Sequence, residues 1–488
     1  MPIVSSTAGQ VLDDVYIIET QSPPNIQGVV TGIVKMVGDF TRGIPGAVYT
    51  ISDYNTAVRN LGPSTLSVNG PLNIQALIKQ YAGGLQITPV FGTTATPAEY
   101  TLEDVSAGKV LTLEAAQVHP QTGLTTAILG SDANNMTVTV AVSGSTFSLT
   151  IYDPRTNTSE TYTGLTDSTA VATINAASKI VIASLPTSPS SLLPVTGTFS
   201  FTGGGNGTPG DSDFIGTTNT GLMALNAITG NMVFVANQYS PAVNSAVAVH
   251  GNTYDCIPLT CLAPGATVTA TVTGNANVQD NMAYCDGWRT MYDTDTGTNR
   301  NIAPTALVAG MAAQLAWYKS WGNKSIYGTL AAVTPRSPVD LATLQAVGVL
   351  CVADNIPRGG VGTRSGVAAN GGDLYVRRSR YFLENSAVSS MGWAVDEMQS
   401  SSPMDSLRKD VKGSLDAFLT PLANPSDPAN KQIDSFLVIC DTSNNTPTTV
   451  AAGSLVVNYK VRLLGSAKQI SVFADISTST VTTSSVAS

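Results

Sequence analysis

The sequence predicts a multidomain protein of mixed α+β and α/β class, with an inserted β-rich domain (a sandwich or a barrel) and an extended arm at each end. Three observations lead to this prediction. The 488 residues suffice for about three domains of ordinary size. Helix and strand patterns alternate before residue 95 and after residue 213, which is typical of α/β domains. Short alternating runs separated by turns fill the stretch between them and indicate a β-rich domain.

The predicted boundaries divide the chain into six segments. They are an N-terminal arm (1–28), a small α/β domain (29–95), the β-rich insertion (96–212), a middle α/β domain (213–360), a C-terminal core domain (361–462), and a C-terminal arm with its tail (463–488).

The composition restricts the classes of function. Hydrophobic residues make up 43% of the chain, so it is expected to be globular. Charged residues make up only 12%, and the net charge is -9. An acidic chain without a basic stripe is poorly suited to bind nucleic acid or anionic membranes. No signal peptide and no run of roughly 18 apolar residues is visible, so we expect folding in the cytoplasm.

The N-terminal arm contains a strand with no obvious sheet of its own. Residues 11–20 are apolar and β-prone, but Ser22-Pro23-Pro24 separates them from the first α/β domain. A strand isolated in this way needs a sheet from elsewhere, either in another subunit or at the edge of this chain's own domain. The residues expected to form it are Val15, Tyr16, Ile17 and Ile18.

The next segments contain helix and strand signals in order. In the first α/β domain we expect strands over 29–37 and 85–91, with a helix capped by Ser52 and a helix started by Pro71 between them. In the insertion, the runs 136–142 and 145–152 alternate as strands do, and turns come at Asp153-Pro154 and at 203–207. This stretch either interrupts the first domain or comes after it. In the middle domain we expect strands over 232–236 and 349–353, and a helix that starts at Pro304.

The C-terminal part also mixes helices and strands. We expect a strand over 373–376, a helix over 377–393, a helix from Pro403, and strands over 436–441 and 453–461. Residues 469–476 alternate and form a second strand without an obvious sheet, in which the arm residues are Ile470, Val472, Phe473 and Ile476.

No catalytic, cofactor-binding or metal-binding residues are predicted. The two histidines, His119 and His250, have no ligand-like neighbours at zinc spacing and are expected at the surface. The glycines at 203–207 lack the ending of a phosphate loop. The turn at 293–297 resembles half of a calcium loop, but Pro304 stands where its final glutamate would be. The five cysteines include no C-x-x-C pair and are expected to be buried thiols. We therefore expect a protein that is not an enzyme.

Two stretches resemble the contractile bacteriophage tail sheath family. The first runs from Met36 to Pro45 and continues through Leu61-Gly62-Pro63, a helix from Pro71 and Gly83-Gly84. The second begins with Tyr375-Val376-Arg377-Arg378 and the helix 407–419. It ends with Cys440-Asp441, Asn445-Thr446-Pro447 and Gly453-x-Leu455, in the order and spacing of the family.

The resemblance implies an α/β sheath core that polymerises as stacked hexameric rings around a tail tube. It implies arms that pair with sheets of neighbouring subunits, and contraction that drives the tube through the host envelope. The implied partners are copies of the same chain, the tail tube protein, and baseplate and tail terminator proteins. The implied location is the virion, after assembly in the host cytoplasm. Candidate charged contacts to subunits or tube are Arg377, Arg378, Arg380, Arg408, Lys409 and Asp410, unless these only form solvated helix faces.

Two other interpretations remain open. The chain is alternatively another virion protein, such as a tube or decoration protein. The insertion is alternatively a carbohydrate-binding module or an enzyme, although its aromatic residues are few, mainly Phe147, Tyr152 and Tyr162.

Overall fold

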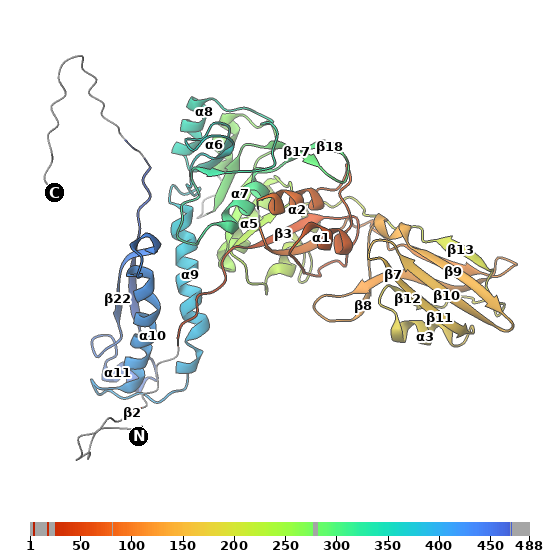
Figure 1. Ribbon diagram of the computed structural model, residues 1–488, viewed down its shortest axis with the longest axis horizontal. Coiled ribbons are helices and arrows are strands. Elements are labelled where there is room, and N and C mark those ends of the chain that lie inside the picture. The colour runs from red at the N-terminus through yellow and green to blue at the C-terminus, as the bar shows by residue number, and fades with distance from the viewer. Residues whose placement is uncertain are drawn as a thin grey trace. The chain divides into compact units, whose positions relative to one another are not determined.

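The computed structural model describes residues 3–4, 17–18, 25–80, 82–276, 282–468 and 470. The chain forms two compact units (Figure 1). The larger unit comprises Pro24–Glu397, and the smaller unit comprises Met1–Pro23 together with Met398–Ser488.

A nine-stranded sheet forms the centre of the larger unit. Six adjacent strands run parallel in the order β20-β16-β15-β14-β3-β5, and short antiparallel strands extend both edges. In chain order the strands are β3 (Ile33–Asp39), β4 (Tyr49–Ile51), β5 (Gly84–Val90), β14 (Met232–Val235), β15 (Ile257–Cys261), β16 (Ala283–Asp286), β19 (Lys324–Ser325), β20 (Val349–Ala353) and β21 (Gly362–Thr363).

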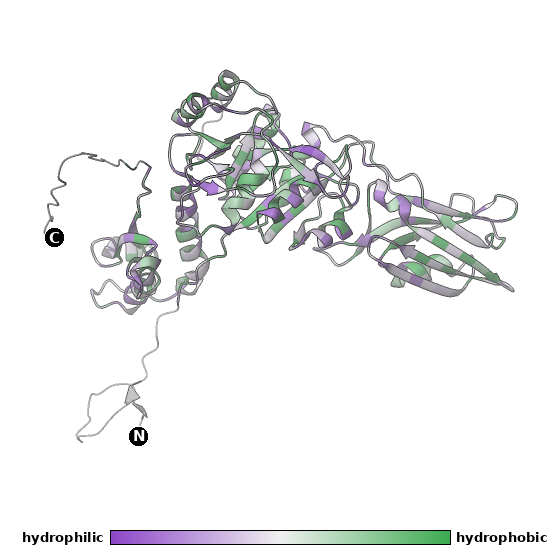
Figure 2. Cartoon of the chain, turned by 45° about the horizontal axis from the view of Figure 1, so that its top comes forward, coloured by the Kyte–Doolittle hydropathy of each residue, from purple (hydrophilic) through white to green (hydrophobic). Residues whose placement is uncertain are grey.

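Helices cover both faces of this sheet, which explains why its central strands are continuous apolar runs. Met36 of β3 packs into the core formed with helices α2 and α7, whereas its neighbour Val37 packs into a separate core with helix α5. Figure 2 shows apolar residues along the strands. The helices of the larger unit include α1 (Tyr54–Leu61), α2 (Gly70–Lys79), α5 (Pro241–Thr253), α6 (Val268–Ala276), α7 (Pro304–Gln314), α8 (Pro338–Ala346) and α9 (Leu374–Ser390).

Residues 29–95 and 213–360 were expected to form separate domains, whereas the structure places strands of both ranges in one sheet. Strand β14 pairs in parallel with β3 over four residues. Strand β21, from the segment that begins at residue 361, pairs with β20 of the same sheet. The insertion therefore interrupts a single sheet in the chain, and pairing between distant strands decides the domain boundaries.

Several helix starts differ from those expected from the sequence. Asp53, not Ser52, caps α1, because its carboxylate accepts the Thr56 amide at 2.9 Å. The strand expected over 373–376 is wrong, since α9 begins at Leu374 and is buried along most of its length. The helix expected from Pro403 begins at Ser406 instead. The helix at Pro304 and the helix at Pro71 begin where the prolines predict.

The insertion consists of two four-stranded sheets. One has the order β11-β10-β9-β13, and the other joins β12, β7 and β6, with β8 paired to β7. Tyr100 of β6 and Phe199 of β13 stack with ring centroids 5.0 Å apart. The elements are β6 (Glu99–Glu103), β7 (Lys109–Val118), β8 (Thr125–Ala127), β9 (Thr137–Ser143), β10 (Thr146–Asp153), β11 (Thr158–Leu165), α3 (Ala170–Ala177), β12 (Val181–Ser184) and β13 (Gly197–Ser200).

The two ends of the insertion are fastened to each other. Thr96 and Gly205 exchange backbone hydrogen bonds of 3.0 Å in both directions. The Gly92 amide donates to the Asn206 carbonyl at 3.0 Å just outside this pair. The chain thus leaves the sheet after β5 and returns toward β14 through one narrow neck.

A buried cluster of charges joins the insertion to the sheet. Arg42, in the loop after β3, is 0% exposed and donates two hydrogen bonds to Asp153, at 3.2 and 2.5 Å. Asp132 stands 3.8 Å from the same guanidinium and is also paired with Arg155 at 2.6 Å. No sequence pattern pointed to this cluster, although Arg42 is the only charged residue in residues 40–51.

The smaller unit is built around helix α10 (Ser406–Ala423) and the strands β22 (Ile433–Ile439) and β23 (Asn458–Leu463). Asp405 caps α10 by accepting the Arg408 amide at 3.1 Å. A short helix, α11 (Pro447–Ala451), lies in the connection between the two strands. The N-terminal segment contributes β1 (Ile3–Val4) and β2 (Ile17–Ile18), which pair in parallel.

Candidate assembly interface

The sheet of the smaller unit has open edges. Strands β22 and β23 pair antiparallel, and in the described part of the chain no third strand joins them. A two-stranded sheet is marginal by itself, and its outer edges present amide and carbonyl groups that are not used in the ladder. At each of these edges an added strand would extend the sheet.

The two faces of this sheet differ. Phe436 pairs with Val461, and both lie on the same face as the buried Val438, but each is still half-buried. Leu437 pairs with Lys460 on the opposite face, where Leu437 is 52% exposed. Helix α10 packs against β22 and leaves part of the apolar face open. An added strand with alternating apolar residues would cover the rest of it.

Asn445 holds the connection between these strands. Its side-chain amide donates to the Val456 carbonyl at 2.7 Å, and its side-chain oxygen accepts the Val456 amide at 2.7 Å. The same amide group donates to the Asp441 carbonyl at 3.2 Å. Thr446 then caps α11, whose first residue is Pro447. The Asn445-Thr446-Pro447 part of the C-terminal resemblance therefore shapes the β22–β23 connection.

The predicted arm residues lie mostly outside the described residues. This is the case for Val15, Tyr16, Val472, Phe473 and Ile476. Ile17 and Ile18 form β2, which pairs with β1, and Ile470 is 85% exposed. Pairing of either arm with a neighbouring subunit stays a prediction.

Three of the six candidate charged contacts are buried within their own chain. Arg377 donates to Asn252 at 2.7 Å and to the Tyr381 hydroxyl. Arg378 is 1% exposed and donates to the Ala312 carbonyl at 2.6 Å, near the end of α7. Burial lowers the pKa of Arg378 to about 10. These arginines support the packing of α9 within their own chain.

The third buried arginine is Arg408, which donates to the Ser400 carbonyl at 2.7 Å and to the Ser402 carbonyl. It fixes the loop before α10. The remaining candidates, Arg380, Lys409 and Asp410, lie at or near the surface. Arg380 pairs with Glu384 at 2.8 Å on the exposed side of α9. Only these three have the accessibility that a contact between subunits requires.

The usual ligand position of a parallel sheet is filled. Open α/β sheets bind ligands at the carboxyl ends of the strands, where the chain direction across the sheet reverses, here between β3 and β14. Arg300 occupies this region and donates to the Val68 carbonyl at 3.1 Å and to the Asn69 side chain at 3.0 Å. Arg300 belongs to the hairpin of β17 (Arg289–Asp293) and β18 (Thr298–Ile302).

The N-terminus of α2, which would suit an anion, already holds a carboxylate. Asp39 accepts the backbone amides of Asn69 and Gly70 at 3.1 Å. Burial raises the pKa of Asp39, and these amide donors oppose the shift. A bound phosphate would therefore have to displace a carboxylate of the protein itself.

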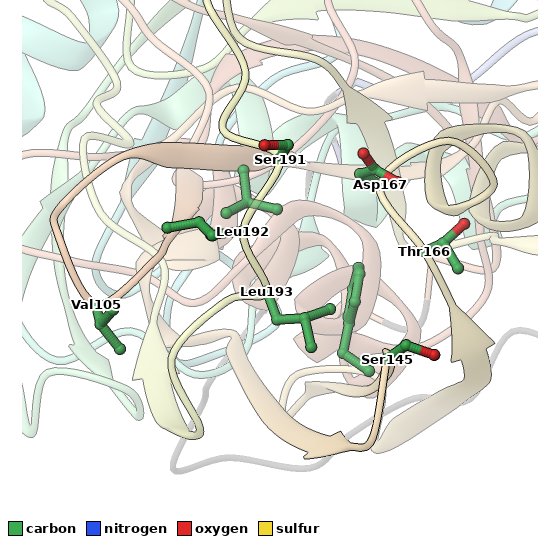
Figure 3. Close-up of a pocket in the computed structure, with 9 residues that line it drawn as sticks. Val105, Ser145, Thr166, Asp167, Ser191, Leu192 and Leu193 are labelled. Carbon is green, nitrogen blue, oxygen red and sulfur yellow. The ribbon is translucent and has the colours of Figure 1, made fainter.

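One concave feature lies at the end of the insertion (Figure 3). The cavity has a volume of about 470 Å³ and lies between the turn at Val105, the turn at Ser145 and the loop at Leu192. Phe147 is the aromatic side chain among its lining residues, and it is almost completely buried. Sugar rings usually stack on exposed aromatic faces, so this cavity gives little support to a carbohydrate-binding insertion.

His250 is buried, so its predicted surface position is wrong. It lies in α5 with its Nε2 atom 3.0 Å from Nζ of the buried Lys35. Burial, with Lys35 as the second cause, lowers the pKa of His250 to about 3. Burial also lowers the pKa of Lys35. His119 is partly exposed at the start of a turn, where its Nδ1 atom accepts the Gln121 amide.

The described residues contain no group of three or more His, Cys, Asp or Glu side chains that could hold a metal ion. Across the same residues, no helix combines the length and the hydropathy needed to cross a membrane. All five cysteines are buried and unpaired.

Comparison with known proteins gives a match in fold. No protein-family model and no curated protein matches the sequence. The sheath tail protein of Listeria innocua is 13% identical with a TM-score of 0.60, over 91% of this chain and 94% of that chain. The sheath tail protein of Desulfitobacterium hafniense is 16% identical with a TM-score of 0.57, over 92% and 100%. The contracted helical sheath of the anti-feeding prophage is 12% identical with a TM-score of 0.55, over 96% and 99%. The chain has the fold of contractile tail sheath proteins.

Proposed function

We propose that the chain is the sheath subunit of a contractile bacteriophage tail. It assembles as stacked hexameric rings around the tail tube, in contact with baseplate and terminator proteins. Contraction drives the tube through the host envelope during genome delivery. The observation that carries this proposal is a sheath fold over at least 91% of the chain, combined with a two-stranded sheet whose edges are open.

Subunits are joined by strand addition. The strand around Tyr16 and the strand around Val472 pair with the edges of β22 and β23 in neighbouring subunits. Main-chain hydrogen bonds supply the attachment, and the alternating apolar side chains of the added strands cover the half-buried Phe436 and Val461. The C-terminal resemblance supports this role, because Asn445 keeps β22 and β23 in register for a third strand.

Contraction requires no fuel and no catalytic site. The extended sheath is metastable, and release lets the subunits move into a second packing with more contacts between neighbours. Arg380, Lys409 and Asp410 are the exposed charges that we assign to contacts with subunits or tube. The role is mechanical and not enzymatic, and the protein belongs to the virion once assembly in the host cytoplasm is complete.

Electron microscopy of the purified chain tests the proposal. Full-length protein is expected to form hollow helical tubes, and protein without residues 1–20 is expected to lose them. Tyr16→Pro removes a ladder amide and is expected to act like the deletion, whereas Tyr16→Thr keeps the amide, replaces one strand-favouring side chain with another and is expected to form tubes.

The outcomes separate the parts of the proposal. Tubes from every variant would keep the sheath but refute an essential N-terminal arm. Compact monomers from every variant, across salt and concentration, would refute the sheath and favour the binding-module interpretation of the insertion.

A further inference from the structure

An extended segment of the larger unit lies along helix α9 (Figure 1). We call residues 25–32 the strap. The Gln27 amide donates to the Ser390 hydroxyl at 3.1 Å, and the Val29 amide donates to the Ser386 hydroxyl at 3.0 Å. Two residues of extended chain span roughly 6.6 Å, and four residues of helix rise about 6 Å. The distance between alternate strap residues therefore matches the distance between serines four residues apart in α9. The strap runs antiparallel to α9, because the later strap residue bonds to the earlier serine.

Packing fits the strap closely to the helix. A side chain at Gly28 would place its Cβ atom 3.0 Å from Cζ of Phe382. The Phe382 ring is stacked on Trp317 at 4.5 Å, which limits how far it can move aside. Ile26, two residues before Gly28 in the sequence, is also buried. A side chain at residue 28 would therefore crowd the Phe382 ring.

The other end of the strap is also fixed. The Gly32 amide donates to the Asn231 side chain at 2.8 Å, and the Ile33 amide donates to the same oxygen at 3.2 Å. Gly32 has a φ of +100°, and a Cβ atom there would lie 2.4 Å from the Ala313 carbonyl oxygen. The strap thus connects β3 to the C-terminal end of α9 without slack.

The chain crosses between its two units twice, and both crossings lie close in sequence to residues at this end of α9. One crossing lies between Pro23 and Pro24, and Pro24 is three residues before Gln27. The other lies between Glu397 and Met398, and Glu397 is seven residues after Ser390. The bond between Gln27 and Ser390 links the strap, which follows the first crossing, to the end of the helix, which precedes the second crossing.

We infer that Ser386 and Ser390 are positioning residues that hold the two crossings close to each other. The larger unit then turns about the C-terminal end of α9 when the sheath changes state. With a single pivot, the N-terminal arm and the smaller unit keep their attachments while the larger unit rotates. Two separated crossings would be pulled in different directions by the same rotation. This inference rests on the proposed sheath function for its purpose, but its geometry can be tested without assembly.

The test compares the full-length chain with the Ser386→Ala/Ser390→Ala variant at concentrations where both are monomeric. Ser379→Ala is the matched control, because Ser379 is a buried serine of α9 that bonds only to the Tyr375 carbonyl, at 2.7 Å. Hydrogen exchange is followed over residues 25–30. Distances between the units are followed by paired spin labels on Leu66→Cys and Thr448→Cys, which label selectively because the five native cysteines are buried.

Loss of both serines is expected to speed exchange of the Gln27 and Val29 amides about fivefold each, because each amide loses one bond, and to broaden the distance distribution. Ser379→Ala is expected to change neither. Unchanged exchange would overturn the strap contacts. Faster exchange with an unchanged distance distribution would overturn the pivot. If these results hold but the wild-type chain never forms tubes, the positioning role of Ser386 and Ser390 stands and the proposed function fails.

Discussion

The buried charge cluster between the insertion and the sheet is expected to be sensitive to the loss of one carboxylate. Asp153→Ala removes both hydrogen bonds that Asp153 accepts from the completely buried Arg42, at 3.2 and 2.5 Å. Asp132 stays 3.8 Å from the guanidinium but is already paired with Arg155. The variant therefore leaves a buried cation with one shared and more distant partner.

Removing one member of a buried ion pair costs about 3 to 5 kcal/mol. The attraction of Asp132 reduces this cost, whereas the loss of the bonds from the Arg155 amide (2.9 Å) and the Thr156 hydroxyl (3.0 Å) increases it. We expect a loss of about 4 kcal/mol in the free energy of local unfolding. Burial alone would raise the pKa of Asp153, but Arg42 and the other donors outweigh burial and hold that pKa below its ordinary value. The stabilising contribution of the ionised Asp153 to the free energy of unfolding is therefore present above about pH 4 and is lost below it.

Native-state hydrogen exchange over β9, β10 and β11 measures this change, because exchange reports the free energy of local opening. Asp167→Ala is the control, since Asp167 is an exposed carboxylate of the same insertion whose bond is to the neighbouring Ser168 amide, and we expect a change within about 0.5 kcal/mol. Replacing the pair together, as Arg42→Met with Asp153→Leu, should cost less than Asp153→Ala alone. A loss below about 1 kcal/mol for Asp153→Ala, or strictly additive effects of the two replacements, would refute the reasoning.

Three further predictions concern stability. The pKa of His250 is lowered to about 3 in the folded chain, so between pH 6.5 and pH 3 the unfolded chain binds a proton that the folded chain does not. The free energy of unfolding therefore falls by about 1.4 kcal/mol for each pH unit in this range. His250→Gln should flatten this dependence in urea unfolding at pH 7 and pH 5, and an equal slope in both proteins would contradict it. Asn445→Ala should cost about 2 to 4 kcal/mol, because both backbone groups of Val456 lose their partner, and a thermal melt unchanged from wild type would argue against that role. Gly32→Ala should cost roughly 2 to 4 kcal/mol through its positive φ and the contact with Ala313, whereas Gly83→Ala meets no atom within 4 Å and should be neutral or slightly stabilising; equal denaturation midpoints would contradict this.

Local signals in the sequence predicted many of the helices and strands. Pro71 and Pro304 start helices as expected, because proline fits the first turn of a helix and its missing amide has no partner there anyway. Tyr375 and Val376 suggested a strand, but burial of α9 on several sides outweighs their β propensity. Ser52 and Asp53 are both good caps, and the structure shows that Asp53 accepts the amide.

The arrangement of the sheet could not be predicted in the same way. Pairing of β3 with β14 joins segments almost 200 residues apart, and no local pattern specifies that register. Arg377, Arg378 and Arg408 were candidates for contacts to subunits or tube, or else for solvated helix faces, and arginine is rarely buried. Their burial is explained by carbonyl partners from other parts of the fold, which a helical pattern does not show. Serines four residues apart in α9 were a visible signal, but their partners are backbone amides of a segment without a pattern of its own.

The closed neck of the insertion has a consequence for how the chain folds. Strand β14 is made long after β5, yet it must find β3 next to it, and closing so long a connection slows folding. Once Thr96 and Gly205 have exchanged their hydrogen bonds, more than a hundred residues are removed from that search, and the effective connection is as short as an ordinary crossover. An insertion that folds first and brings its own ends together leaves the sheet a short connection to close, and the buried pair of Arg42 and Asp153 then adds a second attachment between the two.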